Sequence, residues 1–309
     1  MEKIKLYEIC DERHIIAIVD DLIICYEILD DLSLKCLQKY DNMPNIIQIL
    51  KHSKNFYIFL AFDTIIYISL DNDYNLSYET GIQTNYKHNK VINLSNGKIA
   101  VDAQYSIILI YNILSNNKIM LQTKIDMKID YSPISLYYIE KTNELLIRSY
   151  QQIYFMNLEK YKFDYIINEY NLYIWGSDYD RIMGNPLENN FCLINEHLLA
   201  MSFSKNVITL VDLNTHKKIK NFIDSHDNIT SLIKPDNFLD NHFLCSIYSY
   251  DCHGGKYYYF ANAKLIEFGI IKNDYDNFDV EYYNKIKIDK FPVSIRLLRN
   301  EIILMLCLN

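Results

Sequence analysis

The stretch from Val207 to Leu232 reads Val207-Ile-Thr-Leu-Val-Asp-Leu213, Asn214-Thr-His-Lys-Lys218, Ile219-Lys-Asn-Phe222 and, after two residues, Ser225-His226-Asp227-Asn-Ile-Thr-Ser-Leu232. Its apolar segments are short and alternate or nearly alternate with polar residues, which is typical of β-strands. The segments between them are rich in Asn, Asp, Ser and Thr, whose side chains hydrogen-bond nearby backbone groups in turns. The pattern predicts an antiparallel meander of three short strands.

The same strand pattern recurs along the chain. Each segment that aligns with the strand before Asp212 places an apolar or aromatic residue before a small or polar one. The aligned small or polar residues are Glu27, Ser69, Asn112, Asn157, Asp212 and Gly269, with spacings of 42, 43, 45, 55 and 57 residues. Steps of this size are typical of propeller blades. The pattern predicts an all-β fold, a β-propeller of about seven four-stranded antiparallel blades, of which the last is incomplete in this chain.

Asp212 and His226 also make the stretch resemble a WD40 repeat. Such a repeat ends one strand in a large apolar residue followed by Asp, and opens the next with a His before an apolar-Thr-Ser-Leu strand. An Asp-Thr turn is common before the third strand of the family, and Asp63-Thr64 stands there. The hallmark Trp is absent from all the aligned strands, and the hallmark Asp occurs only at position 212. The resemblance is therefore to a degenerate WD40-like propeller, and it implies that Asp212, His226 and Asp63 are structural repeat positions.

The repeat predicts a single domain over residues 1–309, although the length alone would suggest about two domains. The fifth blade is expected to begin with a strand at Tyr170–Trp175 and to carry an inserted loop at Gly176–Asn190. The sixth is expected to carry an extended β-ribbon at Cys252–Phe260, because adjacent glycines permit a tight hairpin. The expected blades are 3–40, 44–84, 89–127, 132–168, 170–222 and 227–289, with a partial blade at 291–309.

The last blade is expected to lack two strands, which would leave Ile302–Leu308 as an open apolar edge. Three sources of the missing strands stay open. The segment before Asp11 can pair with the last blade, another protein can donate strands, or the sequence can be one part of a longer chain. The second case would resemble open scaffold propellers that a partner completes.

Composition and charge narrow the class of protein. The formal net charge is -8 and the pI is near 5.5, which argues against nucleic acid as a partner. No apolar run reaches the ~18 residues of a membrane span, and the N-terminus lacks a signal peptide, so no membrane partner is expected. The seven cysteines are scattered singly, mostly in apolar segments, which favours reduced thiols in a cytoplasmic or nuclear protein.

No catalytic, cofactor or metal site is predicted. The eight histidines belong to no known catalytic motif, and His226 is better explained by the repeat than by acid–base chemistry. The pair Asp178 and Asp180 lacks the further ligands of a calcium loop. The expected first strands begin at Ile46, Ile134, Ile229 and Val293, which predicts an apolar lining for the central channel and argues against an enzyme.

These observations predict a non-catalytic scaffold or adaptor that presents loops on a rigid platform to other proteins. Partner contacts are expected at the two insertions, at Tyr179, Arg181, His253, Tyr257 and Tyr258. By the WD40 layout, the Cys252–Phe260 hairpin and the His226 loop project on one face, and the Gly176–Asn190 loop on the other. The alternatives are a propeller-based hydrolase with its site at the central channel, or an open scaffold that a partner's strands complete.

Overall fold

The computed structural model describes residues 4–19, 22–40, 45–127, 135–149, 152–168, 191–204, 207–223, 227–233, 242–253, 257–272, 278–288, 291–299 and 302–308. Within these ranges the chain forms β-strands and one short 3-10 helix, η1 (Glu140–Thr142), which confirms the predicted all-β class. None of the helical residues in these ranges forms a segment long and apolar enough to cross a membrane. The chain divides into two compact units, Met1–Ser149 with Ile153–Asp164, and Tyr150–Gln152 with Tyr165–Asn309.

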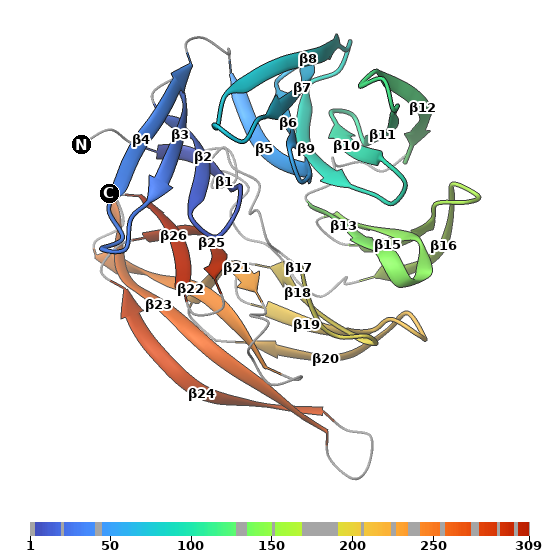
Figure 1. Cartoon of the computed structure of the whole chain (residues 1–309). Helices are drawn as coiled ribbons and strands as arrows, with labels where there is room; N and C mark the ends of the chain where they lie inside the picture. The colour runs from blue at the N-terminus through green and yellow to red at the C-terminus, as the bar shows by residue number, and fades with distance from the viewer. Residues whose placement is uncertain are drawn as a thin grey trace. The chain divides into compact units, whose positions relative to one another are not determined.

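The first unit contains four sheets, each built from four strands that follow one another in the sequence (Figure 1). The last strand of the fourth sheet ends beyond the boundary of the unit. The strands are β1 (Ile4–Ile9), β2 (His14–Val19), β3 (Leu22–Ile28) and β4 (Leu34–Tyr40); β5 (Ile46–Ser53), β6 (Phe56–Ala61), β7 (Thr64–Leu70) and β8 (Leu76–Gln83); β9 (His88–Asn93), β10 (Lys98–Ala103), β11 (Ile107–Ile113) and β12 (Ile119–Asp126); and β13 (Ser135–Ile139), β14 (Glu144–Arg148), β15 (Gln152–Asn157) and β16 (Lys162–Asn168).

The described part of the second unit adds two sheets of four strands and one of two. Their strands are β17 (Phe191–Asn195), β18 (Leu198–Ser204), β19 (Val207–Asp212) and β20 (Lys217–Ile223); β21 (Asp227–Ile233), β22 (His242–His253), β23 (Tyr257–Lys272) and β24 (Phe278–Ile288); and β25 (Phe291–Arg299) and β26 (Ile302–Leu308). In the last sheet, β26 pairs antiparallel with β25 from Ile302 to Leu308. Strand β1 pairs with β2 in its own four-stranded sheet.

Burial explains the order of the strands within each sheet of the first unit. The second and third strands are almost wholly apolar and buried, as in β2 and β3, whereas the fourth strand β4 is mostly exposed. Side chains of neighbouring sheets form shared cores, which hold Ile16 with Tyr57 and Phe59, and Leu60 with Val101. Burying such side chains contributes ~1.5–3 kcal/mol each, so sheet-to-sheet packing stabilises this unit.

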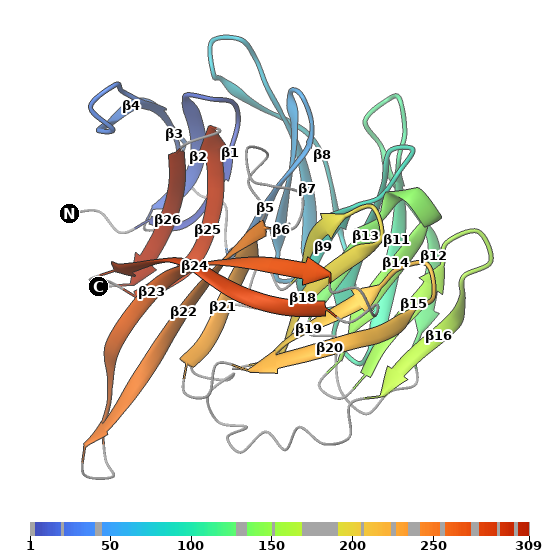
Figure 2. The same ribbon diagram turned by 90° about the horizontal axis from the view of Figure 1, so that it is seen from below.

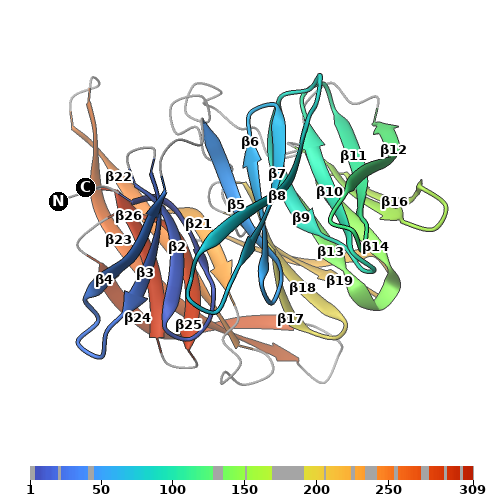
Figure 3. The ribbon, with the colours of Figure 1, turned by 45° about the horizontal axis from the view of Figure 1, so that its top comes forward.

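The first strands of successive sheets are neighbours: β1 contacts β5, β5 contacts β9, and β9 contacts β13. Figure 1 shows the fourth strands β4, β8 and β12 away from these contacts, and Figure 3 shows the same for β4 and β12 from another side. Two side-chain amides join β5 to β9. The Gln48 amide donates to the Val91 carbonyl (2.9 Å) and accepts the Val91 N–H (2.8 Å), and the Asn93 amide donates to the Lys51 carbonyl (2.7 Å). The first strands thus carry polar residues as well as the expected apolar ones such as Ile46.

The fifth sheet begins later than predicted. Its first strand is β17, with Phe191 opposite Met201 and Leu193 opposite Leu199 of β18. Tyr170–Trp175 was expected to be the first strand of this blade. That prediction is wrong for the strand that pairs with β18, which is β17. The reason is local: Phe191–Asn195 is itself apolar, and only a two-residue turn separates it from β18, so it forms the hairpin with the smaller loop. Tyr170–Trp175 and Gly176–Asn190 lie outside the described residues.

The extended ribbon expected in the sixth sheet is present. Strands β22 and β23 continue their pairing from Tyr250 opposite Phe260 to His253 opposite Tyr257. Pairing with β21 reaches only Ser249, and pairing with β24 starts at Ala263. Figure 2 shows the resulting two-stranded ribbon extending past β21. Its backbone is therefore paired on one side only in the described residues.

Candidate functional site

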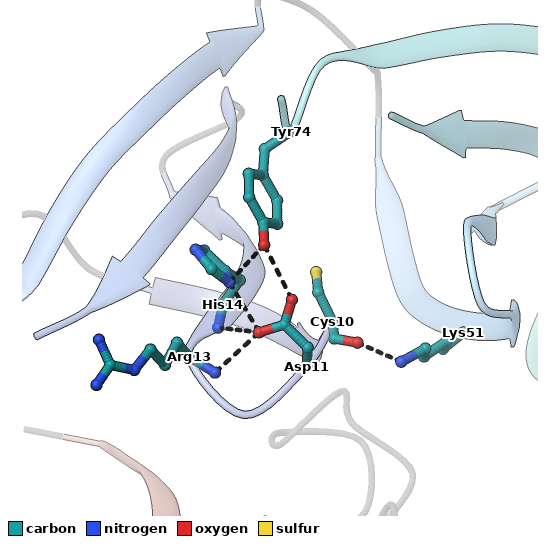
Figure 4. A network of polar contacts seen from close by, with 6 residues as sticks. All are labelled: Cys10, Asp11, Arg13, His14, Lys51 and Tyr74. Carbon is teal, nitrogen blue, oxygen red and sulfur yellow. Dashed lines mark hydrogen bonds and ion pairs between the residues drawn. The ribbon is translucent and has the colours of Figure 1, made fainter. Parts of the chain in front are cut away.

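Asp11 organises the turn between β1 and β2 (Figure 4). Its Oδ1 accepts the backbone N–H of Arg13 (2.9 Å) and of His14 (3.0 Å). An aspartate that accepts N–H groups two and three residues ahead forms an Asx turn, which needs no glycine. The segment Asp11-Glu-Arg-His14 is therefore held in one conformation at the end of the first hairpin.

His14 and Tyr74 extend this turn to the next sheet. Tyr74 lies between β7 and β8 at a positive φ of 62°, and its ring stacks on that of His14 with centroids 3.9 Å apart. Its hydroxyl lies 3.0 Å from Asp11 Oδ2 and 2.7 Å from His14 Nδ1, which is itself 2.7 Å from Asp11 Oδ1. One proton arrangement satisfies all three contacts: Nδ1–H donates to Asp11 and to the phenolic oxygen, while the phenol donates to Asp11.

Two basic residues, Arg13 and Lys51, lie beside the cluster of Asp11, His14 and Tyr74. The Arg13 guanidinium donates to Asp30 Oδ1 at 3.0 Å, and both side chains are mostly exposed. The Lys51 ammonium, on β5, donates to the carbonyl of Cys10, next to Asp11. The cluster of Asp11, His14 and Tyr74 thus joins turns of the first two sheets, with Lys51 as a further contact between those sheets.

The acid–base state of the cluster follows from its contacts. Burial alone would raise the pKa of Asp11, but the Arg13 N–H, His14 and the Tyr74 hydroxyl stabilise the carboxylate more and lower that pKa. Burial, followed by the hydrogen bond to Asp11, raises the pKa of Tyr74 to about 12. Asp11 is therefore ionised and Tyr74 neutral at pH 7, and each group is engaged in holding the turns. In the described ranges, no three His, Cys, Asp or Glu side chains are grouped to hold a metal ion.

A second polar cluster lies between the turn that precedes β9 and the turn between β6 and β7. His88 Nδ1 lies 3.1 Å from the Ala61 carbonyl, and His88 Nε2 lies 2.8 Å from Thr84 Oγ1. Burial lowers the pKa of His88, so the ring is neutral, with Nδ1–H as donor and Nε2 as acceptor. The backbone N–H groups of His88 and Thr84 donate to the carbonyls of Phe62 (2.6 Å) and Asp63 (2.8 Å).

A buried carboxyl group lies farther along the third sheet. Asp102 on β10 is 2% exposed and stands opposite Lys90 of β9 in the ladder. Its Oδ2 accepts the Asn89 amide at 3.2 Å, and its Oδ1 has no hydrogen-bond partner among the described residues. Burial raises the pKa of Asp102 well above its usual range, although Asn89 and Lys90 act in the opposite direction.

The repeat positions make turn contacts where they are described. Asp212 Oδ1 accepts the N–H of Asn214 (2.8 Å) and its Oδ2 accepts the Thr215 hydroxyl (3.0 Å), so Asp212 closes the turn between β19 and β20. Asp63 differs from its expected role in detail. Its carboxylate accepts the Thr64 hydroxyl (3.0 Å), and its carbonyl accepts the N–H of Thr84 (2.8 Å), which lies after β8.

The expected partner-contact residues are not brought together within the described residues. Tyr179 and Arg181 lie outside them, and so does the repeat position His226. His253, Tyr257 and Tyr258 belong to the paired strands of the ribbon, where His253 stands opposite Tyr257. That these residues contact a partner stays a prediction.

Sequence reasoning missed the clusters of Asp11 and His88. Asp11 and Tyr74 are 63 residues apart, and no motif links them, so only the packing of two sheets brings them together. His88 had a usable signal. His88 is the first residue of a first strand, and His226 was expected at the same place in its own repeat. The resemblance to WD40 repeats that pointed to His226 could therefore also have pointed to His88.

Comparison with known proteins places the fold. No family model and no curated protein sequence matches the chain. The crystal structure of Saccharomyces cerevisiae Sqt1 matches 87% of this chain and 93% of its own with a TM-score of 0.55 and 10% identity. A chain of the mitotic checkpoint complex matches 99% of this chain and 85% of its own with a TM-score of 0.64 and 10% identity. A Lactobacillus plantarum protein gives a TM-score of 0.59 at 12% identity over 84% of each chain.

Identities this low show a shared fold and nothing about activity. The first two structures are WD40 β-propellers, and the sheets of this chain follow the order that such blades require. The chain therefore has the fold of a degenerate WD40-like β-propeller, in agreement with the resemblance seen at Asp212 and the aligned third strands.

Proposed function

We propose that the protein is a non-catalytic platform that binds other proteins through the turns at the ends of its strands. The observation that carries this proposal is that polar side chains fix some of the turns, while large apolar or aromatic side chains are exposed at others. Asp11, His14 and Tyr74 use their polar atoms to fix turns, while Leu32, Phe62 and Tyr105 at other turns are 60%, 42% and 79% exposed. Rigid turns with exposed side chains reduce the entropy lost on binding, which favours recognition.

The Asp11 cluster supports a structural role over an acid–base role. A general base needs a free nitrogen or oxygen within reach of a substrate proton. His14 is only 16% exposed at its side chain and its ring is stacked on that of Tyr74, so little of the imidazole is open to a substrate. One structure of the same fold comes from the mitotic checkpoint complex, and membership of a complex agrees with a binding role.

The proposal can be tested by photo-crosslinking in cells. A photoreactive phenylalanine analogue is placed in the full chain at Tyr105 or Leu32, at the tips of turns, or at Tyr78, which is 65% exposed on the outer strand β8. We expect discrete protein adducts from at least one turn position and a much weaker signal from Tyr78. Equal, diffuse labelling at all three positions would contradict the proposal.

The two-stranded sheet of β25 and β26 suggests a second kind of contact, in which added strands complete the sheet. The six other sheets have four strands in the described residues, so this sheet lacks the outer pair. We propose that strands from a partner, from the N-terminal segment or from more of the same chain complete it. Since β1 already pairs with β2, the N-terminal source would have to use the other edge of β1 or the residues before it.

We also propose that the protein resides in a reducing compartment, the cytoplasm or the nucleus. Cys10, Cys25 and Cys36 are free thiols in the described residues. Burial raises the pKa of the Cys10 and Cys25 thiols to about 12, so these thiols are protected from oxidation. Free thiols fit a cytoplasmic or nuclear protein.

A further inference from the structure

Two exposed aromatic residues occupy equivalent places in neighbouring sheets. Phe62 lies in the turn between β6 and β7, and Tyr105 in the turn between β10 and β11; they are 42% and 79% exposed. Each stands seven residues before the aligned polar position of its repeat, Ser69 or Asn112. Tyr150 stands at the same distance before Asn157 and lies outside the described residues. The repeat therefore places aromatic side chains at consecutive turn tips.

The backbone beneath these aromatic residues is fixed by hydrogen bonds. The Phe62 carbonyl accepts the His88 N–H (2.6 Å), and the Lys87 carbonyl accepts the Gln104 N–H (2.8 Å). These two bonds join the turns that carry Phe62, Lys87 and Tyr105, three exposed residues that we call the aromatic–lysine patch. The buried, neutral His88 ring supports the same turn from below, so the patch is formed before any partner arrives.

The backbone at Tyr105 is unfavourable for a tyrosine. Its φ is 67°, and that of Ser106 is 59°, a region that glycine or asparagine occupies at lower cost. With 79% of its surface exposed, the side chain recovers little of that cost by packing. The large ring is therefore presented to the outside of the fold rather than used within it.

Lys87 gives the patch its charge. Its Nζ lies 4.6 Å from the centroid of the Phe62 ring, and the structure gives its ammonium no ion pair among the described residues. The adjacent carboxylate, Asp63, is directed to the Thr64 hydroxyl and, at 3.5 Å, to the Gln83 amide. Nearby Lys124 is already engaged, since its Nζ donates to the Tyr86 hydroxyl at 2.7 Å. One cation without an ion pair in the described residues thus lies against the exposed Phe62 ring, and its backbone is bonded to the residue before Tyr105.

We infer that the aromatic–lysine patch binds a segment of a partner protein that carries one acidic side chain next to an aromatic or aliphatic one. The carboxylate would pair with Lys87 while the apolar side chain covers Phe62 and Tyr105. Tyrosine is among the residues that most often carry the binding energy of an interface. The net charge of -8 repels polyanions at long range, which favours a sparsely acidic peptide over nucleic acid. This inference rests on the proposed function and specifies one surface for it.

The test is selection of a randomised linear peptide library, displayed on phage, against the full-length chain. Selected peptides are then synthesised, and their affinities are measured by fluorescence anisotropy. We expect enriched peptides to place Asp or Glu beside Phe, Tyr, Trp or Leu. Binding should fall about tenfold or more in the Phe62→Ser/Tyr105→Ser double variant and in Lys87→Glu.

Matched variants are Tyr78→Ser on β8 and Lys118→Glu before β12, which remove an exposed ring or reverse an exposed charge elsewhere. They should bind as the unmodified chain does, and all variants should keep its urea midpoint. Peptides that bind equally well to the double variant would overturn the inference and leave the proposed function standing. Enrichment of basic peptides would also overturn it. Failure to enrich any peptide, together with tight binding of a labelled oligouridine, would overturn both.

Discussion

Asp11 is the residue on which the first turn cluster depends, because its two oxygens accept four of the contacts described above. Replacing it by alanine leaves the Arg13 and His14 N–H groups and the Tyr74 hydroxyl without this acceptor. Since the side chain is 48% exposed, water replaces part of the loss. We expect Asp11→Ala to lower the free energy of unfolding by about 1–2 kcal/mol, measured by urea denaturation at pH 7.

A suitable control for this variant is Asp73→Ala. Asp73 is an exposed aspartate in the turn before β8, and its side chain accepts no hydrogen bond in the described residues. Its removal should change stability by less than about 0.5 kcal/mol. Equal effects of the two substitutions would mean that the Asp11 cluster does not stabilise the fold.

The buried carboxyl group of Asp102 leads to a second prediction for a single residue, which concerns how stability depends on pH. Because burial raises its pKa in the folded chain above the ordinary value of about 3.9, folding favours the protonated carboxyl. Its contribution to stability is thus complete below about pH 4 and is lost as the pH rises toward the folded pKa. Asp102→Asn has no such titration. We expect the variant to gain stability relative to the unmodified chain as the pH rises from 4 to 7.

Urea denaturation of both proteins at several pH values checks this difference, and effects of all other titrating groups cancel in the comparison. A loss of stability in Asp102→Asn that grows toward pH 7 would mean that the attraction of the Lys90 charge outweighs burial. The pKa of Asp102 would then be lowered rather than raised.

At the scale of the element, β5 and β9 are joined by the side-chain amide of Gln48. It satisfies both the N–H and the carbonyl of Val91, whose own side chain is fully buried. Gln48→Ala leaves two backbone groups near the core without that partner, which should cost about 1–3 kcal/mol of unfolding free energy. Amide hydrogen exchange should also become faster at Val91 than in the unmodified chain.

Gln122→Ala on the exposed strand β12 is the matched control, because the Gln122 side chain makes no hydrogen bond in the described residues. It should leave both the stability and the exchange rate at Val91 unchanged. If Gln48→Ala behaves in the same way, the first strands are held by packing alone.

The strands themselves could be predicted from the sequence because their signal is local. Alternation of apolar residues and the recurring polar position located the third strands, and adjacent glycines located the ribbon that ends near His253. Contacts between sheets have no local signal. Gln48 reads as an ordinary polar residue in a strand, and Tyr74 as an ordinary turn residue, until two sheets pack together. The expected first strand at Tyr170–Trp175 shows the same limit, because the sequence alone does not say which of two apolar segments pairs with β18.

At the scale of the whole molecule, charge decides which large partners can approach. A net charge of -8 repels the phosphate backbone at distances beyond any single contact. We expect the full chain to show no salt-dependent binding of single-stranded RNA or duplex DNA in fluorescence anisotropy, at low or at physiological salt. A steep fall of affinity with rising salt would instead reveal a basic surface that the total charge conceals.

The positive-φ turns have a consequence for the gene that encodes this fold. Among the described residues, ten non-glycine residues have positive φ, and four of them are asparagine: Asn45, Asn96, Asn117 and Asn143. The chain has only 7 glycines in 309 residues, and Gly97 alone of those described has positive φ. Glycine codons require two guanines, whereas asparagine codons begin with two adenines. A gene poor in guanine and cytosine can therefore encode the tight turns of a propeller, with asparagine and side-chain hydrogen bonds in the place of glycine.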